Sequence, residues 1–297
     1  MKRVWLDLIS QQKLLCLLTY CFMALTSLST HAQVSTPRIV TLSPHLAEIV
    51  AEVGGISQLV GVAAYSNYPS AVKPLPVVGD YQSLNLELLK QLQPDIILIW
   101  TSGTPANQQA KLQALFKNTS TRIIQSDALS LDAIPLEIKR IGQIIGHEAQ
   151  AQQVSRHFQS ELQKIRQSQV KKTPISVFFQ AWSSPLMTLQ EDHLISDMIK
   201  LCGGVPIFSQ EKIQISAVSI EAVIAKNPEV IMSASESQSN GNLQDFDQWK
   251  KYSNLKANRL NGYLSINGDW LTRPSSRALL ASHEICRFFD IIRAKRS

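Results

Sequence analysis

The sequence is poor in the residues that mark unusual classes of protein. Its 297 residues include only 12 Gly and 13 Pro, too few for a collagen-like chain or for one dominated by linkers. No apolar run reaches the roughly 20 residues that span a bilayer. With 44% hydrophobic residues, the chain can bury a sizeable core and divide into two domains.

A strong charge of one sign is also lacking. The chain carries 29 basic and 23 acidic residues, for a net charge of +6. No run of Lys and Arg lies away from the extreme ends. Because the excess is mild and spread out, it argues against nucleic acid as the main partner.

The motifs of common catalytic sites are missing as well. The sequence contains no G-x-S-x-G elbow, Walker loop, G-x-G-x-x-G or H-E-x-x-H, so we expect no enzyme and no resident metal. Beyond the N-terminal segment the histidines are dispersed: His45, His147, His157, His193 and His283. His45, beside Ser43-Pro44 at a strand end, is the one candidate axial ligand for a porphyrin or corrin metal. Otherwise it would cap the following helix or face solvent.

The first 32 residues have the features of a secretory signal peptide. Lys2 and Arg3 give a basic start, residues 14–28 are mostly apolar, and Thr30-His31-Ala32 offers a cleavage site. An uncleaved anchor is the alternative, while the bulky Tyr20 before Cys21 disfavours lipidation. We therefore expect a soluble, exported mature chain.

Cysteine is scarce in that mature chain. Cys16 and Cys21 fall inside the signal, which leaves Cys202 and Cys286. Two thiols in an oxidising compartment favour one disulfide, with two separate buried thiols as the alternative. Neither has a Cys or His partner at ligand spacing, so a zinc site is not supported.

Short apolar runs alternate with helical patterns along the rest of the chain. Continuous apolar strands separated by helices predict parallel sheets that are covered on both faces. The first half has expected strands at 39–42, 59–64, 96–100 and 122–125, and helices at 46–52, 86–91 and 106–116. The second half repeats the alternation over residues 175–180, 194–201, 218–225, 230–233 and 263–266, with a closing helix at 275–292.

A long helix is predicted between the two halves. Apolar residues recur at helical spacing over 148–169: Val154, Phe158, Leu162 and Ile165. Such a helix is about 33 Å long and forms a rigid spine rather than a flexible linker. The expected fold is α/β, with two Rossmann-like lobes on parallel-rich sheets, residues 36–146 and 173–297, joined by a helical segment, 147–172.

An internal repeat indicates that the two lobes are related. The sequence NLE at 85–87 is followed by Pro94-Asp95 and an apolar strand. At equal offsets, SIE at 219–221 is followed by Pro228-Glu229 and another such strand.

Aromatic residues make up only 7% of the chain, but four follow or end predicted strands: Tyr65, Trp100, Trp182 and Trp270. This edge of an open α/β sheet is where ligands bind, and a cleft between two lobes collects residues from both. Tyr68 and Tyr81, on loops of the first lobe, could face the same cleft. Taken singly, each ring is as well explained by packing. Together they predict a wide, flat-walled site for a bulky ring system.

The loop 267–277 is dense in hydrogen-bonding groups. Asp269 can accept from amide N–H groups, and Arg273 can donate to amide oxygens or phosphate. The alternative is a salt bridge together with a helix cap at Ser275.

Several stretches carry a resemblance to a known family: RIVTLSP at 38–44, GVAAYSNYP at 61–69, NLE at 85–87, CGG at 202–204, and Asp269-Trp270 with Arg273. With them, residues 37–293 resemble the substrate-binding proteins of ATP-driven (ABC) importers that have two lobes and a rigid helix. The resemblance is strongest to the periplasmic cobalamin-binding members.

This resemblance implies roles for individual residues. The residues expected to line a cobalamin cleft, counting the aromatic Trp182, are Tyr65, Tyr81, Trp100, Trp182, Asp269, Trp270, Leu271, Thr272 and Arg273. Cys202 is expected to pair with Cys286. The family has Trp where this chain has Tyr81 and Ile215, and the second change removes an aromatic wall.

The resemblance also implies that Glu87 and Glu221, one on each lobe, dock onto arginines of the membrane permease. Equivalent acids on paired lobes would meet a two-fold symmetric partner twice, although each acid could simply stabilise the N-terminus of its helix. We therefore expect a periplasmic carrier, monomeric when free, that delivers vitamin B12 or a related corrinoid to an ABC importer without coordinating its cobalt. Haem or a ferric siderophore is the alternative cargo.

Overall fold

The computed structural model describes residues 36–189, 192–208, 215–235 and 246–296. From Pro37 onward the chain forms one compact unit. The predicted signal peptide, residues 1–32, lies outside the described residues and stays a prediction.

The N-terminal lobe, from β1 to α5, is built on a parallel sheet with the strand order β2-β1-β3-β4. Its strands are β1 (Ile39–Thr41), β2 (Leu59–Val62), β3 (Ile96–Trp100) and β4 (Arg122–Ser126). The central strands β1 and β3 are almost wholly buried. Burial on both faces explains why they are continuous apolar runs rather than alternating ones.

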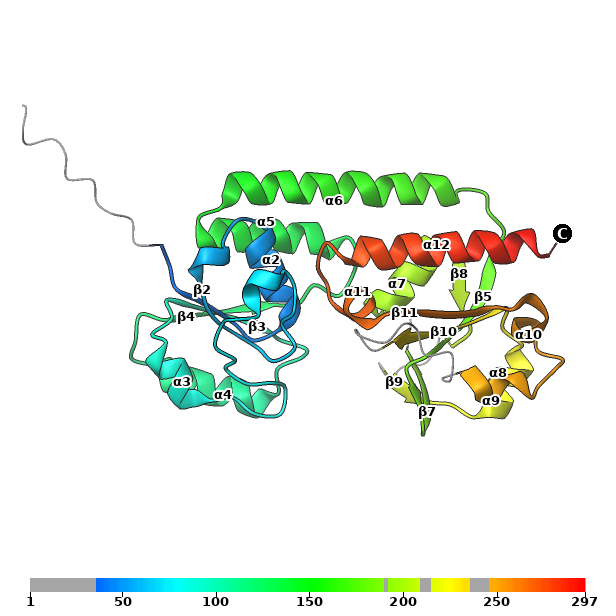
Figure 1. Cartoon of the computed structure of the whole chain (residues 1–297), viewed down its shortest axis with the longest axis horizontal. Coiled ribbons are helices and arrows are strands. Elements are labelled where there is room, and N and C mark those ends of the chain that lie inside the picture. Colours follow the sequence, from blue (N-terminus) through cyan, green and yellow to red (C-terminus); the bar gives the residue numbers. More distant parts are fainter. Residues whose placement is uncertain (1–35, 190–191, 209–214, 236–245, 297) are drawn as a thin grey trace, which may run out of the picture. The chain divides into compact units, whose positions relative to one another are not determined.

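Helices cover both faces of this sheet (Figure 1). They are α2 (Pro44–Glu52), α3 (Leu86–Gln91), α4 (Ala106–Phe116) and α5 (Ala133–Ile145), with short 3-10 turns at Ile56–Gln58 and Ser70–Val72. On one face, Leu46 of α2 and Ile138 of α5 share a buried cluster with Ile96. On the other face, Leu89 of α3 packs with Ile97. The sequence did not predict α5, whose first turn contains Pro135, a position where proline is tolerated.

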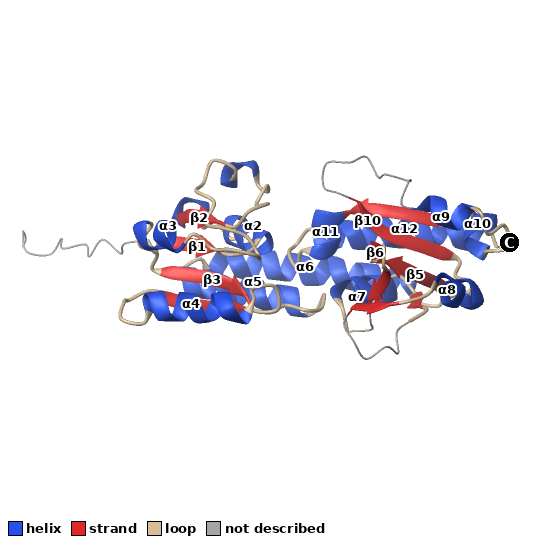
Figure 2. Cartoon of the chain, turned by 90° about the horizontal axis from the view of Figure 1, so that it is seen from below, coloured by secondary structure: helices blue, strands red, loops and turns tan. Residues whose placement is uncertain are grey.

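The C-terminal lobe, from β5 to α12, repeats this plan with the strand order β11-β10-β5-β8. The strands, all parallel, are β5 (Ile175–Gln180), β8 (Gly204–Pro206), β10 (Val230–Ser235) and β11 (Tyr263–Asn267). The helices are α7 (Leu194–Leu201), α8 (Ile220–Lys226), α9 (Asp247–Lys250), α10 (Lys256–Leu260), α11 (Gly268–Thr272) and α12 (Ala278–Ala294). Figure 2 shows helices on both sides of each sheet. The α/β fold with two parallel sheets is therefore confirmed.

A small antiparallel sheet in this lobe was not predicted. It consists of β6 (Trp182–Ser183), β7 (Leu186–Leu189) and β9 (Ile215–Ala217). Strands of two to four residues are too short to produce a recognisable alternation of apolar and polar residues.

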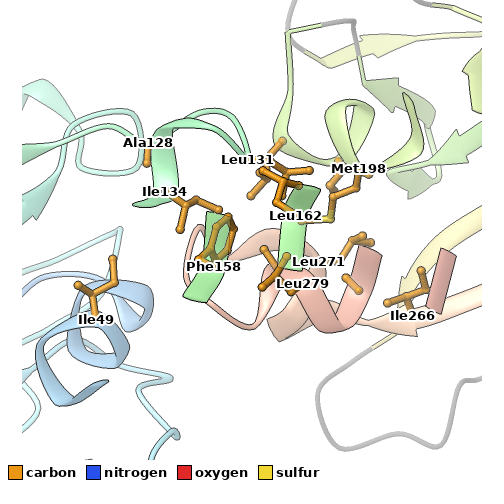
Figure 3. Close-up of a cluster of buried hydrophobic side chains, with 14 of the residues drawn as sticks. Ile49, Ala128, Leu131, Ile134, Phe158, Leu162, Met198, Ile266, Leu271 and Leu279 are labelled. Atoms are coloured by element: carbon orange, nitrogen blue, oxygen red, sulfur yellow. The ribbon is translucent and has the colours of Figure 1, made fainter. Parts of the chain in front are cut away.

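The predicted spine is α6 (Glu148–Gln169), and its bounds agree with the sequence pattern. Its apolar stripe enters one buried cluster that contains residues of both lobes. In Figure 3, Phe158 and Leu162 of α6 lie among Ile134 of the N-terminal lobe and Leu279 and Met198 of the C-terminal lobe. Because all of these side chains share one core, moving one lobe against the other would disrupt close packing.

The internal repeat is also a structural repeat. Asn85 and Ser219 cap α3 and α8 by accepting from the backbone N–H three residues later. Asp95 accepts from the backbone N–H of Arg38 at 2.8 Å, and Glu229 accepts from that of Ser176 at 3.0 Å. In each lobe the acid after the proline thus fixes the start of the neighbouring parallel strand.

The predicted disulfide joins Cys202, at the end of α7, to Cys286 in α12. The two residues are 84 positions apart, and closing so long a loop stabilises the folded chain by roughly 4 kcal/mol in the chain-entropy model. The pairing is confirmed, and the alternative of two separate thiols is wrong.

Candidate ligand-binding site

The carboxyl ends of strands from both lobes border two cavities. Cavity A, about 340 Å³, is lined mainly by residues that follow β3 and β4 or end β5, β7 and β10, and by the start of α7. Cavity B, about 130 Å³, is lined by residues that follow β1, β2 and β3. Trp100, the last residue of β3, borders both. Two cavities therefore lie at the sheet edge where the sequence predicts ligand binding.

Trp100 is held between two neighbours. The His45 ring meets it edge-on, with ring centroids 5.3 Å apart. The second neighbour is Gly103, which lies so close that a Cβ at this position would be 2.0 Å from the indole Cε3. Glycine is thus required at position 103 for the indole to occupy this place.

Tyr65 and Tyr81 project from loops beside cavity B. Their side chains are 75% and 65% exposed. Gln108 Nε2 donates to the Tyr81 carbonyl at 2.8 Å, and Arg273 Nη2 donates to the Tyr65 carbonyl at 3.0 Å. Tyr65 has a φ of 65°, an unfavourable backbone conformation for a bulky residue. These hydrogen bonds hold the backbone at both positions, and the exposed ring faces remain accessible, although the Tyr81 hydroxyl accepts from Gln82 Nε2 at 2.9 Å.

Cavity A is mostly apolar. Its walls include Trp100, Phe179, Leu189, Leu194, Ala234 and Pro274. Two of its hydroxyl groups are already engaged as donors: Ser102 Oγ to Asp127 at 2.5 Å, and Thr272 Oγ1 to the Gly268 carbonyl at 2.7 Å. His193 also lines this cavity.

The predicted polar pair of the loop after β11 is engaged within the protein. Arg273 Nη2 lies 2.6 Å from Asp269 Oδ1. Arg273 Nη1 donates to Asn67 Oδ1, and Asn67 Nδ2 donates to Asp269 Oδ2, both at 2.9 Å. The salt bridge offered as the alternative is confirmed. A contact of Asp269 or Arg273 with a ligand stays a prediction.

Glu48 of α2 completes this network and was missed by the sequence analysis. Its buried carboxylate accepts from Arg273 Nη1 at 2.9 Å, from Ser275 Oγ at 2.6 Å and from both Arg277 Nε and Nη2. The expectation that Ser275 caps the last helix is wrong, because its hydroxyl donates to Glu48 and α12 begins only at Ala278. The available signal was the four-residue spacing shared by Glu48 and Glu52 and by Arg273 and Arg277.

His45 neither faces solvent nor acts as a free ligand at the surface. It is 3% exposed, inside the first turn of α2, and its Nδ1 lies 3.2 Å from Ser43 Oγ. Burial, together with the charge of Arg273, lowers its pKa to about 3. The expected alternative of a solvent-facing or capping residue is wrong. His45 instead supports the Trp100 ring.

The other predicted aromatic residues lie apart from cavities A and B. Trp182 is 64% exposed in β6 and donates to the Ser184 carbonyl at 3.1 Å. Trp270 packs against the shared core, and Leu271 is fully buried in it. The Tyr68 ring lies under the Arg277 guanidinium, 4.5 Å from its centroid, and so does not join the other tyrosines. The side chain of Ile215 lies outside the described residues.

The two predicted docking acids occupy equivalent positions. Glu87 is exposed in the first turn of α3, and Glu221 is exposed in the first turn of α8. Both helices cover the sheet faces that are turned away from the core containing α6. A capping side chain two residues earlier, Asn85 or Ser219, already serves each helix start, which leaves the carboxylates available.

Two features are absent from the described ranges. Across residues 36–296, apart from the undescribed gaps, no group of three His, Cys, Asp or Glu side chains could hold a metal ion. In the same ranges no helix is long and apolar enough to cross a membrane.

Comparison with known proteins agrees with this geometry. The sequence model of the family described as periplasmic binding protein matches residues 39–262. The chain belongs to this family. Over 255 residues, 86% of the chain and 89% of the relative, this periplasmic binding protein is 32% identical to the vitamin B12-binding protein of Vibrio cholerae. It is also 32% identical over 271 residues to the vitamin B12-binding protein of Pectobacterium atrosepticum, covering 90% and 93% of the two chains.

Solved structures support the same placement. The crystal structure of the periplasmic vitamin B12-binding protein BtuF of Vibrio cholerae has a TM-score of 0.76 at 32% identity, covering 86% of this chain and 97% of that one. The haem-binding protein HutB of Vibrio cholerae has a TM-score of 0.75 at 21% identity, covering 86% and 99%. The second likeness shows the fold alone. This periplasmic binding protein is therefore a substrate-binding protein of the ABC importer type and not an enzyme.

Proposed function

We propose that this protein captures cobalamin or a related corrinoid in the periplasm and delivers it to an ABC importer of the inner membrane. The observation that carries the proposal is the aromatic wall formed by Trp100, Tyr65 and Tyr81 around cavity B. Two of these rings are mostly exposed and make no core contacts that explain their presence. Exposed aromatic rings beside a concave surface favour a large, flat, partly apolar ligand.

Apolar contact and hydrogen bonds hold the corrinoid in this proposal. Cavity A offers an apolar wall on the other side of Trp100. Arg273 and Asp269, paired with each other and with Asn67, position the Tyr65 loop, and in this proposal a ligand amide would have to share the groups already used in these bonds. The cobalt keeps its own axial ligands, since His45 is buried behind Trp100. Trp182 and Trp270 line neither cavity A nor cavity B. They can therefore contact the ligand only if it extends beyond both cavities.

In this proposal, Glu87 and Glu221 contact the importer during delivery. Glu87 and Glu221 stand at equivalent places on the two lobes, so a two-fold symmetric permease would meet both in the same way. Basic residues on that partner would complement them. The leader segment 1–32 would export the chain, and it would work as a monomer when free.

Isothermal titration calorimetry of the purified mature chain tests the ligand. We expect saturable binding of cyanocobalamin with one site per chain, and no saturable binding of haemin or of a ferric siderophore. Tight binding of haemin with no response to cyanocobalamin would replace the corrinoid with haem in the same fold. Binding of none of the three would reject the proposed cargo.

A further inference from the structure

Two side chains that line cavity A have a polar edge without a partner among the described residues: the buried Nε1–H of Trp100 and the imidazole of His193, which lies nearer the start of α7. His193 precedes α7 and is half-buried. Its Nδ1 accepts from the backbone N–H of Ile195 at 3.1 Å, which caps the helix. No partner for Nε2 is found among the residues that the structure describes.

The cap fixes the tautomer of this ring. An Nδ1 that accepts a hydrogen bond carries no proton, so the proton of the neutral imidazole lies on Nε2. Burial lowers the pKa of His193, which keeps the ring neutral near pH 7. The ring therefore presents a single uncharged N–H donor on the edge opposite the cap.

The surroundings of the ring decide what this donor can bind. The neighbouring walls of cavity A are mostly apolar, including Leu189, Leu194 and Pro274, and the one charged lining residue among those described is the exposed Asp192, which as a carboxylate offers no donor. The hydroxyl protons of Ser102 and Thr272 are already donated to other groups. A ligand oxygen buried against these walls would lose water and needs a donor in return.

We infer that His193 is a specificity-determining residue of the proposed corrinoid site, and that its Nε2–H donates to an uncharged amide oxygen at the ligand periphery. This inference rests on the proposed function. Corrinoids carry several primary amides around the ring, and each offers a carbonyl acceptor. A neutral donor in an apolar wall suits an amide better than a carboxylate, which calls for a positive charge.

The same geometry argues against metal coordination by His193. To bind cobalt or iron through Nε2, the ring would have to move its proton to Nδ1. That proton would then point at the N–H of Ile195, two donors facing each other. Coordination would thus cost the helix cap, whereas donation from Nε2 preserves it.

The variant His193→Asn separates the two functions of the ring. Asparagine caps helices well and would keep the bond to Ile195. Its side chain is shorter, however, and lacks the Nε2–H donor that the imidazole presents to the cavity. We expect His193→Asn to unfold at the wild-type temperature and to bind cyanocobalamin about tenfold more weakly in calorimetry. His193→Ala should lose both affinity and stability. His283→Asn, on the exposed side of α12, is the matched control and should bind as the wild type does.

A spectroscopic measurement tests the mode of binding. Aquocobinamide lacks the nucleotide base, so a histidine that coordinated cobalt would shift its visible spectrum to that of an imidazole complex. We expect no such shift, and we expect 15N NMR to show the His193 proton on Nε2 with and without ligand. An imidazole-type spectrum that disappears in His193→Asn would overturn the inference, as would wild-type affinity in that variant. Failure of the wild-type chain to bind any corrinoid would instead reject the proposed function itself.

Discussion

Arg273 Nη1 lies 2.9 Å from Glu48 Oε1, across 225 positions of sequence, and both side chains are almost fully buried. This contact ties α2 of the N-terminal lobe to the loop before α12. Through its other nitrogen the same guanidinium holds the carbonyl of Tyr65. A single buried ion network therefore joins the two lobes and positions one wall of the candidate ligand site.

Removing the charge of Glu48 should destabilise the protein strongly. In Glu48→Gln, Arg273 and Arg277 lose their buried counter-charge, and breaking a buried pair in this way costs about 3 kcal/mol or more. Chemical denaturation at pH 7 measures the loss. The control is Glu161→Gln, whose partner Lys164 is well exposed, and which should leave stability unchanged. Equal stability of the two variants would contradict the structural role of Glu48.

Loss of the Tyr65 ring should weaken ligand binding without weakening the fold. The ring is 75% exposed, so Tyr65→Ala removes little buried surface. A stacked aromatic contact of this kind is worth about 1 kcal/mol or more, and we expect cyanocobalamin affinity to fall about tenfold while Tyr65→Phe retains it. Tyr68→Ala is the control, because Tyr68 lies under Arg277 instead of beside cavity B. If both alanine variants bind alike, Tyr65 is not part of the site.

The sequence predicted much of this fold because its strands are buried on both faces. The bounds of β3, β5, α4 and α6 follow directly from continuous apolar runs or helical periodicity. The small antiparallel sheet was not predicted, because its strands are too short to show a recognisable pattern of apolar and polar residues.

The candidate site was only partly accessible from sequence. The positions of Trp100 and Tyr65 at strand ends predicted that they lie at the same sheet edge, and both border cavity B. This prediction does not require the strand order, because parallel strands end at one edge of their sheet. The partners of Arg273 could not be predicted, since Glu48 meets it only after both lobes have packed. Nor could the sequence show that Leu271 turns into the core while its neighbour Thr272 borders cavity A.

Charge reversal at the paired acids should separate delivery from capture. Both Glu87 and Glu221 are exposed, so Glu87→Lys with Glu221→Lys should leave folding and cyanocobalamin affinity unchanged. Corrinoid uptake into vesicles containing the cognate importer should be lost. The matched control is Glu148→Lys, because Glu148 is also an exposed acid in the first turn of a helix. Uptake by the double variant at the wild-type rate would show that these acids do not contact the permease.

A methyl group at position 103 should displace Trp100. In Gly103→Ala the new Cβ would overlap the indole, which lies 2.0 Å from the Cβ position. Overpacking of this kind costs about 1 to 3 kcal/mol, and moving the ring should also weaken cyanocobalamin binding.

The double variant Gly103→Ala with Trp100→Phe isolates the clash. Phenylalanine lacks the outer indole atoms, so the alanine should cost less stability in that background than in the wild type. Chemical denaturation of the four proteins in this cycle gives the coupling energy. Additive losses would mean that Gly103 is needed for some reason other than the Trp100 ring.

His45 should make the protein sensitive to acid. Its pKa, about 3 in the folded chain, is near 6.5 when the chain is unfolded. Above pH 6.5 the ring is neutral in both the folded and the unfolded chain. Below pH 6.5 it is protonated in the unfolded chain but stays neutral in the folded chain. Stability should therefore fall as the pH drops from 6.5 towards 3, by about 2 kcal/mol from this residue between pH 7 and pH 5.

The variant His45→Leu should remove this contribution. Its free energy of unfolding, from urea denaturation, should fall about 2 kcal/mol less than that of the wild type between pH 7 and pH 5. Between pH 7 and pH 8 the two proteins should change in parallel, because His45 is then neutral in both states. Parallel curves at acid pH as well would mean that the buried ring takes up its proton without unfolding.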